Sequence, residues 1–125
     1  MTSTTELEAI TSRYLAVWSE PDAAVRRQLL TAIWTPDGVE FVDGAQFRGY
    51  DELEARVTEA YEQFVGSGKY TVGNANDATT HDDIVTFTIQ LITTDGDLAW
   101  AARVFLLLDE GGLVQEDYQL TVKPL

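Results

Sequence analysis

Two strand-like runs close to the end of the chain constrain its fold more than any other feature. Residues 98–108 and 114–122 flank a turn at residues 109–112. Because successive side chains of a strand point to opposite faces, each run has two distinct faces. Both faces of the first run are apolar apart from Arg103: Trp100, Ala102, Val104, Leu106 and Leu108 share one, and Ala101, Phe105 and Leu107 the other. A strand of this kind is normally covered on both sides.

The composition fits a single domain that spans residues 1–125. Hydrophobic residues make up 45% of the chain, enough for one core of ordinary size. Cysteine is absent, which excludes disulfides, thiolate nucleophiles and cysteine-based zinc sites. With one histidine we expect no dedicated transition-metal site, although a site made of carboxylates alone stays open. The chain has no glycine-rich phosphate loop, and we expect no cofactor.

The charge of the chain is strongly acidic. Twenty-one acidic residues against eight basic ones give a net charge of −13. Such a surface repels phosphate backbones, and its simplest interpretation is a solvated exterior that keeps the protein in solution. The sequence has no signal peptide pattern and no apolar run of about 20 residues. We therefore expect a cytoplasmic protein with neither a nucleic acid nor a membrane as partner.

Three amphipathic helices are predicted in the first half of the chain. Thr5 and Glu8 fit a capping box at the start of the first helix, and apolar residues then recur at helical spacing. Asp22 can cap the second helix, and Asp51 the third. Each helix would turn one apolar stripe toward a common core.

The remaining segments follow the two-residue period of strands. Short strands are expected over residues 39–42 and between residues 44 and 48. Four more follow the third helix, with a polar connection at residues 76–83 and a hairpin turn at residues 94–97. The order is helix, helix, strand, strand, helix and four strands. It predicts an α+β domain whose three helices cover one face of a curved, mixed but mostly antiparallel sheet.

That order and several local strings resemble the nuclear transport factor 2-like superfamily, and its SnoaL-like branch in particular. The strings are residues 13–22, 37–43, 48–51 and 80–83, together with Leu108, Asp109, Gly112, Asp117 and Tyr118. The superfamily includes polyketide cyclases, ketosteroid isomerases, epoxide hydrolases and non-catalytic members. The resemblance implies a cone-shaped fold with a deep apolar pocket between helices and sheet. It also implies a homodimer through the outer face of the sheet.

Asp117 is the first candidate for a catalytic residue. An acid in an apolar cavity has a raised pKa, which suits proton transfer near neutral pH. The resemblance to the epoxide hydrolases implies a general acid/base at this position. The apolar face of the run holds Tyr118, Leu120 and Val122, and two arrangements follow. If that face lines the cavity, Asp117 points outward, where Arg103 could pair with it; if it forms a dimer interface, Asp117 points inward.

Asp43 and Tyr14 are the other catalytic candidates. The resemblance to ketosteroid isomerases implies that Asp43 abstracts a proton beside a carbonyl and that Tyr14 donates to the developing oxyanion. Each has a structural alternative: Asp43 precedes a glycine, as turn acids do, and Tyr14 occupies a core position on its helix. Two family features are missing. The second oxyanion donor has no counterpart near Arg103, and residues 84–93 lack the Arg-x-Asp pair of the epoxide hydrolases.

Substrate contacts are predicted for a set of mostly aromatic side chains, because ligand pockets are largely apolar with a few polar anchors. The set consists of Trp18, Trp34, Phe87, Trp100, Tyr118, His81 and Arg103. The tryptophans could equally be core residues. His81, the single histidine, lies in a polar stretch and reads as a turn or rim residue.

Two functional hypotheses follow. The first is an enzyme that performs cofactor-free acid/base chemistry on a hydrophobic, oxygen-bearing small molecule: cyclisation, isomerisation, dehydration or epoxide opening. The second is a non-catalytic ligand-binding or dimerisation module of the same fold. The direction in which Asp117 points separates them.

Overall fold

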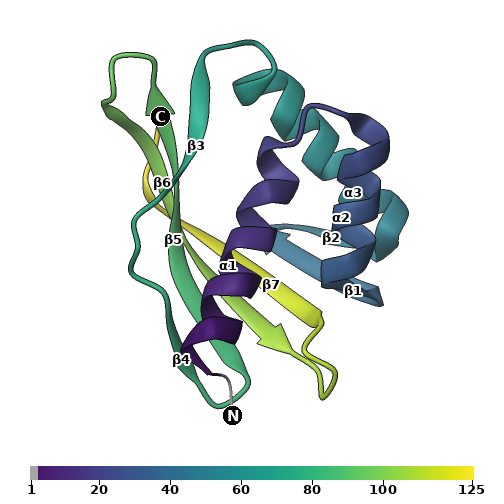
Figure 1. Ribbon diagram of the computed structural model, residues 1–125. Coiled ribbons are helices and arrows are strands. Elements are labelled where there is room, and N and C mark those ends of the chain that lie inside the picture. The colour runs from purple at the N-terminus through teal and green to yellow at the C-terminus, as the bar shows by residue number, and fades with distance from the viewer. Residues whose placement is uncertain (1–2) are drawn as a thin grey trace.

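The computed structural model describes residues 3–125 and contains three α-helices and a seven-stranded sheet. The elements are α1 (Thr4–Ser19), α2 (Ala23–Ile33), β1 (Trp34–Val42), β2 (Ala45–Arg48), α3 (Gly49–Ala60), the π-helical turn η1 (Tyr61–Val65), β3 (Tyr70–Asn74), β4 (Thr79–His81), β5 (Ile84–Thr93), β6 (Leu98–Leu108) and β7 (Val114–Lys123). The helices lie together on one side of the sheet (Figure 1). The predicted α+β class is confirmed.

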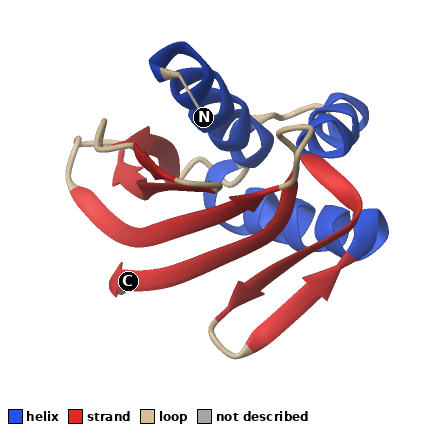
Figure 2. Ribbon diagram, turned by 90° about the horizontal axis from the view of Figure 1, so that it is seen from below, coloured by secondary structure: helices blue, strands red, loops and turns tan. Residues whose placement is uncertain are grey.

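The sheet is mixed and curved, and it bends around the helices (Figure 2). Its strand order is β2-β1-β7-β6-β5-β3, with β4 also paired to β5. All pairs are antiparallel except β1 with β7, which run parallel. The parallel pair places a strand from the first third of the chain beside the last strand.

Two strand boundaries differ from those predicted. β1 begins at Trp34 rather than at Val39, because its first residue already pairs with Val114 of β7. The polar connection at residues 76–83 contains β4, whose three residues pair with the start of β5. The pairing of Trp34 joins strands that are distant in the chain, and β4 is short and polar. In neither case does the local pattern of apolar residues give a signal.

The N-cap of α2 was predicted correctly, but that of α1 was not. Asp22 caps α2 as expected, accepting hydrogen bonds from the backbone N–H of Ala24 at 2.9 Å and of Val25 at 3.1 Å. In α1 the predicted capping box at Thr5 is wrong. Ser3 is the N-cap, and its hydroxyl accepts from the N–H of Glu6 at 3.1 Å. Serine caps as well as threonine, so the sequence offered two equivalent starts.

The predicted cap of α3 is also wrong. The helix begins at Gly49, before Asp51, and its N-cap residue, Arg48, makes no capping hydrogen bond with its own side chain. Asp51 pairs instead with Arg27 of α2 at 3.1 Å. The carboxylate of Glu52 accepts a hydrogen bond from the N–H of Arg48 at 2.9 Å, which satisfies one backbone donor at this end.

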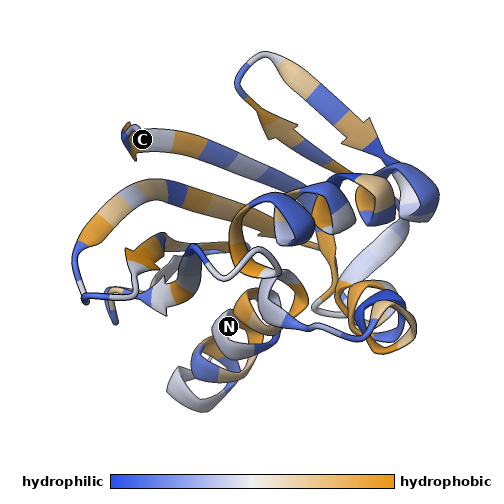
Figure 3. Cartoon of the chain, turned by 90° about the horizontal axis from the view of Figure 1, so that it is seen from above, coloured by the Kyte–Doolittle hydropathy of each residue, from blue (hydrophilic) through white to orange (hydrophobic). Residues whose placement is uncertain are grey.

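The core lies between the helices and the inner face of the sheet. Tyr14 of α1 is at its centre, with ring centroids 5.6 Å from Trp34 and 5.3 Å from Phe87. All three side chains are fully buried. Along β5 apolar and polar residues alternate, and the apolar ones, from Val85 to Leu91, are buried. Figure 3 shows such alternation as bands of colour along the strands. None of the helices in the described part of the chain is long and apolar enough to span a bilayer.

The two faces of β7 settle the direction of Asp117. Asp117 and Gln119 are buried on the inner face, toward the helices. Tyr118, Leu120 and Val122 lie on the outer face and are exposed, Leu120 by 56% and Val122 by 63%. The apolar face of this strand is therefore the outer one, and the inward arrangement of Asp117 is the one observed.

Candidate functional site

A cavity of about 270 Å³ lies between the helices and the inner face of the sheet. Its wall combines α1, α3 and η1 with β1, β3, β5, β6, β7 and the residue Leu125 that follows β7. Most of the lining is apolar: Trp18, Val42, Ala60, Phe64, Val65, Val72, Ile89, Leu91, Trp100 and Leu125. Such a surface suits a small, largely hydrophobic molecule.

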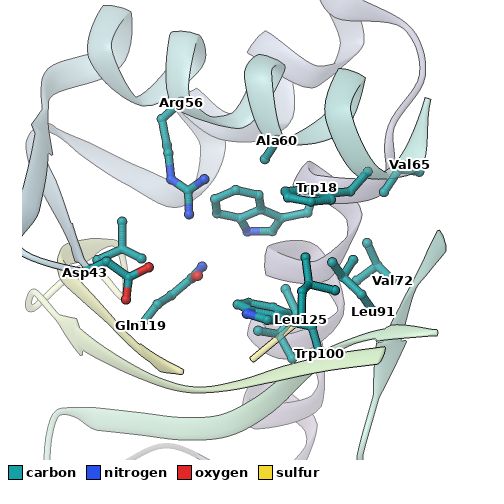
Figure 4. A pocket seen from close by; sticks show the side chains of 13 residues that line it. Trp18, Asp43, Arg56, Ala60, Val65, Val72, Leu91, Trp100, Gln119 and Leu125 are labelled. Atoms are coloured by element: carbon teal, nitrogen blue, oxygen red, sulfur yellow. The ribbon is translucent and has the colours of Figure 1, made fainter. Parts of the chain in front are cut away.

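Three polar side chains meet at one end of this cavity (Figure 4). The guanidinium of Arg56 enters from α3, the amide of Gln119 from β7, and the carboxylate of Asp43 from the turn after β1. We call this the polar end. Because the opposite end is apolar, a bound molecule would be oriented with its polar group toward these three residues.

Asp43 lies in a two-residue hairpin turn between β1 and β2. Val42 and Ala45 pair across the turn, and Asp43 and Gly44 both have positive φ, 50° and 81°. This is the geometry that favours Asp-Gly, because aspartate tolerates the left-handed region and glycine adopts it freely. The turn explains the Asp-Gly string, and it also carries the Asp43 carboxylate to the cavity (Figure 4).

A chain of buried hydrogen bonds runs inward from Gln119. Its Nε2 donates to the hydroxyl of Tyr14 at 2.8 Å, and that hydroxyl donates to Oδ2 of Asp117 at 2.6 Å. Of these three residues only Gln119 belongs to the cavity wall. Tyr14 and Asp117 therefore lie behind the wall and reach the cavity through the amide of Gln119.

Burial keeps this chain uncharged. It raises the pKa of Asp117 well above its usual range, and the nearby charge of Glu40 raises it further. The hydrogen bond from Tyr14 and the charge of Arg56 lower this pKa, but by less. Burial, followed by the charges of Asp117 and Glu40, likewise raises the pKa of Tyr14. Both groups favour their protonated forms, so each can donate a hydrogen bond.

Glu40 and Arg56 form an ion pair beside Asp117. Glu40 is completely buried, and its Oε1 accepts a hydrogen bond from Nε of Arg56 at 2.9 Å. The guanidinium also lies over the rings of Trp18 and Phe47, at 5.1 and 5.7 Å from their centroids. Burial raises the pKa of Glu40, while the contact with Arg56 opposes that rise.

Neither Glu40 nor Arg56 was singled out by sequence patterns. Glu40 did carry a signal, since it interrupts the apolar string Val39 to Val42 just as Asp117 interrupts the last strand. Its position next to Asp117 depends on the parallel pairing of β1 with β7, which no local pattern reveals. Arg56 occupies a polar position of an amphipathic helix, where a solvated side chain is the default expectation.

Four buried polar atoms near the site have no hydrogen-bond partner among the described residues. They are Oδ1 of Asp117, Oε2 of Glu40 and the indole nitrogens of Trp18 and Trp34. Buried groups of this kind destabilise a fold by about 1–3 kcal/mol each. Their concentration around Tyr14 indicates that this region is not optimised for stability alone.

Comparisons with family models and with curated protein sequences gave no match. Solved structures do match. A candidate isomerase of the SnoaL-like family from Agrobacterium tumefaciens superposes with a TM-score of 0.85 at 24% identity, over 94% of this chain and 98% of that chain. A nuclear transport factor 2-like protein from an Exiguobacterium species gives 0.67 at 12% identity, over 90% and 97%. The chain has the nuclear transport factor 2-like fold.

The solved structures that match this chain carry the names of different activities. A candidate polyketide cyclase from Sinorhizobium meliloti matches with a TM-score of 0.70 at 14% identity, over 94% of this chain and 98% of that chain. At such identities the likeness shows the fold and no more, and function has to be argued from the site itself.

Within this fold, the predicted substrate-contacting residues fall into three groups. Trp18 and Trp100 line the cavity. Trp34 and Phe87 pack around Tyr14 in the core instead. The remaining three lie away from the cavity: Tyr118 and Arg103 on the outer face of the sheet, and His81, largely exposed, on β4.

Arg103 pairs with Asp77 rather than with Asp117. Its Nη1 is 2.7 Å from Oδ2 of Asp77, and its Nε donates to the hydroxyl of Thr86 at 2.8 Å. Thr88 also donates to Asp77, which ties the connection before β4 to the outer face of β5. Within residues 3–125 no three acidic or histidine side chains are grouped as metal ligands.

Proposed function

We propose that this protein is an enzyme that transfers a proton on a small hydrophobic carbonyl compound, without a cofactor. The observation that carries the proposal is the polar end of the cavity, where one carboxylate and two hydrogen-bond donors face the same space (Figure 4). Asp43 acts as the base, and Arg56 and Gln119 hydrogen-bond the carbonyl oxygen. A base placed opposite preorganised donors is the arrangement that enolisation requires.

The chemical step is a proton abstraction next to the carbonyl. The C–H bond breaks, its proton passes to the Asp43 carboxylate, and the electron pair moves to the carbonyl oxygen to form an enolate. Arg56 and Gln119 stabilise that oxygen through the hydrogen bonds they donate to it, and the net charge of the site does not change because Asp43 has taken the proton. Return of the proton to a different carbon of a conjugated system gives an isomer, and return to the same carbon gives exchange.

Tyr14 and Asp117 serve this step from behind the cavity wall. The hydroxyl of Tyr14 accepts one N–H of Gln119 at 2.8 Å, which fixes the amide plane and leaves the second N–H for a ligand. Asp117 in turn fixes the hydroxyl of Tyr14. In this assignment they are positioning residues, and Asp43 is the residue that receives the proton.

The size of the cavity limits the substrate. An enclosed apolar space of about 150 Å³ is known to hold benzene, and the cavity here measures about 270 Å³. Compounds with one or two rings therefore match it. The names of two neighbours, a candidate isomerase and a candidate polyketide cyclase, are consistent with chemistry on carbonyl compounds.

Deuterium exchange tests the proposal without knowledge of the natural substrate. A two-ring ketone is incubated with the protein in deuterated buffer, and loss of its α-proton signal is followed by NMR. We expect catalysed exchange that Asp43→Asn reduces by about 10²–10⁴-fold, since this is the usual contribution of a positioned base. Asparagine keeps the turn because it also tolerates positive φ.

Asp95→Asn is the matched control. Asp95 also precedes a glycine in a hairpin turn, between β5 and β6, but it does not line the cavity. It should leave the exchange rate unchanged. Binding of the ketone with no exchange above background would reject the enzyme and leave the ligand-binding module as the function.

A further inference from the structure

The guanidinium of Arg56 presents an unused donor edge to the cavity. Its Nε is bound to Glu40, and neither Nη donates to a protein group among residues 3–125. The other two arginines that are well enclosed by the fold differ in this respect. Arg26 donates through both Nη atoms and Arg103 through Nη1, in each case to the protein itself. The free edge of Arg56 is therefore available to a ligand.

That edge is held in a fixed position. The guanidinium lies over the rings of Trp18 and Phe47, and its side chain is only 21% exposed. Glu40 holds the opposite edge through Nε. Because the guanidinium is already held in place, a ligand oxygen can bind to it with little further loss of side-chain conformational entropy.

The charge around this edge is negative despite the arginine. Glu40 is in contact with Arg56 and compensates its charge, and Asp43 adds a second carboxylate at the polar end. Asp117 has no cation in contact, and burial together with the charge of Glu40 raises its pKa well above the usual range, which favours its neutral form. One guanidinium thus has one carboxylate in contact and a second lining the same cavity, in a chain whose net charge is −13.

We propose that Glu40, although it does not line the cavity, makes the site select neutral carbonyl compounds over carboxylates. An unpaired arginine binds carboxylates strongly through two parallel hydrogen bonds. Here the Nη groups of Arg56 can still donate hydrogen bonds to a ligand, while the charge of Glu40 cancels the attraction of the guanidinium for a negatively charged ligand. Specificity then results from repulsion of the wrong ligand as well as attraction of the right one. The inference rests on the cavity assigned above and names its substrate class.

A pair of ligands with the same shape tests the selection. Cyclohexyl methyl ketone carries a methyl group on its carbonyl carbon, where cyclohexanecarboxylate carries a negatively charged oxygen. Their dissociation constants are measured at neutral pH by titration calorimetry. For the wild-type protein we expect the ketone to bind about tenfold more tightly or better. Equal affinities, tighter binding of the carboxylate, or failure of both to bind at millimolar concentration would overturn the inference.

Glu40→Gln identifies the residue responsible. Its amide oxygen can still accept from Nε of Arg56, but the compensating charge is gone. We expect the carboxylate to gain about tenfold in affinity while the ketone changes little. Glu59→Gln, at an exposed position of α3, changes the net charge equally and should shift neither ligand. Equal shifts in the two variants would assign the selection to the overall charge and reject a role for Glu40.

Two further results keep the outcome decisive. If circular dichroism shows that Glu40→Gln does not fold, Asp43→Asn removes the other carboxylate and should raise carboxylate affinity about threefold, a smaller effect because Asp43 is exposed. No rise would count against the inference. Ketone binding without deuterium exchange rejects the proposed enzyme but not the selection, whereas exchange together with equal affinities rejects the selection alone.

Discussion

Glu40 and Asp117 are direct neighbours across the parallel strands β1 and β7, and of the two only Glu40 is in contact with Arg56. Both side chains are completely buried on the inner face of the sheet. Two carboxylates in such a place cannot both be charged without strong repulsion. Arg56 contacts Glu40, so the raised pKa of Asp117 favours its neutral form, which is hydrogen-bonded to Tyr14.

The first prediction concerns the pH dependence of stability. Folding raises the pKa of Asp117, first through burial and then through the charge of Glu40. A carboxyl of this kind stabilises the fold fully below its unfolded pKa of about 4, and this contribution is lost as the pH rises through the folded pKa. Relative to Asp117→Asn, the wild-type protein should lose stability with rising pH. Urea unfolding across that range measures the difference, and a constant difference would contradict the raised pKa.

Asp77→Asn should show the opposite trend. Burial alone would raise the pKa of Asp77, but the hydrogen bonds from Thr88 and the charge of Arg103 lower it overall. Such a group stabilises the fold above its unfolded pKa, and the contribution is lost as the pH falls through the folded pKa. The variant should therefore be less stable than wild type at neutral pH and equal to it in acid. Because Asp77 is 39% exposed, the effect should also shrink in high salt.

Tyr14→Phe tests the hydrogen-bond chain behind the cavity. It leaves Oδ2 of Asp117 and Nε2 of Gln119 without their buried partner, which should lower the free energy of unfolding by about 1–3 kcal/mol. It should also slow the deuterium exchange, because the Gln119 amide is then free to rotate. Tyr118→Phe is the control: its hydroxyl contacts Glu116 at the surface, and its loss should change stability by less than about 0.5 kcal/mol.

The outer face of the sheet is expected to form a homodimer. Leu120 and Val122 are exposed there, beside the half-buried Phe105 and the stacked rings of Phe41 and Tyr118. Sedimentation at micromolar concentration should give a dimer, and Leu120→Asp should give a folded monomer because it places a charge in the apolar interface. Leu98→Asp, at another exposed leucine at the start of β6, should leave the dimer intact. A wild-type monomer would reject this prediction.

The fold was largely predictable because its strands have clear periods. β5 alternates apolar and polar residues from Val85 to Leu91, and the predicted residues 84–93 match its bounds. The helices were found for the same reason, although the start of α1 was misplaced because Ser3 and Thr5 cap equally well. Local signals of this kind survive in a single sequence because they depend only on neighbours along the chain.

The site was less predictable because it depends on contacts between distant parts of the chain. Asp117 stood out from the sequence, but its direction could be decided only once β7 was placed between β1 and β6. Glu40 and Arg56 are 16 residues apart and meet through the packing of α3 on β1. Arg103 met Asp77 rather than Asp117, because the alternation of β6 turns it to the outer face.

The parallel pairing of β1 with β7 has a consequence for biosynthesis. Glu40 and Tyr14 leave the ribosome well before Asp117 and Gln119, which follow them much later in the chain. Until β7 has been synthesised, the nascent chain therefore exposes to water the unpaired edge of β1 and the side chain of Glu40, which is buried in the folded protein. The pairing of β1 with β7 joins segments separated by most of the sequence, and contacts of this kind slow folding. The docking of β7 therefore completes the cavity and the core in the same step.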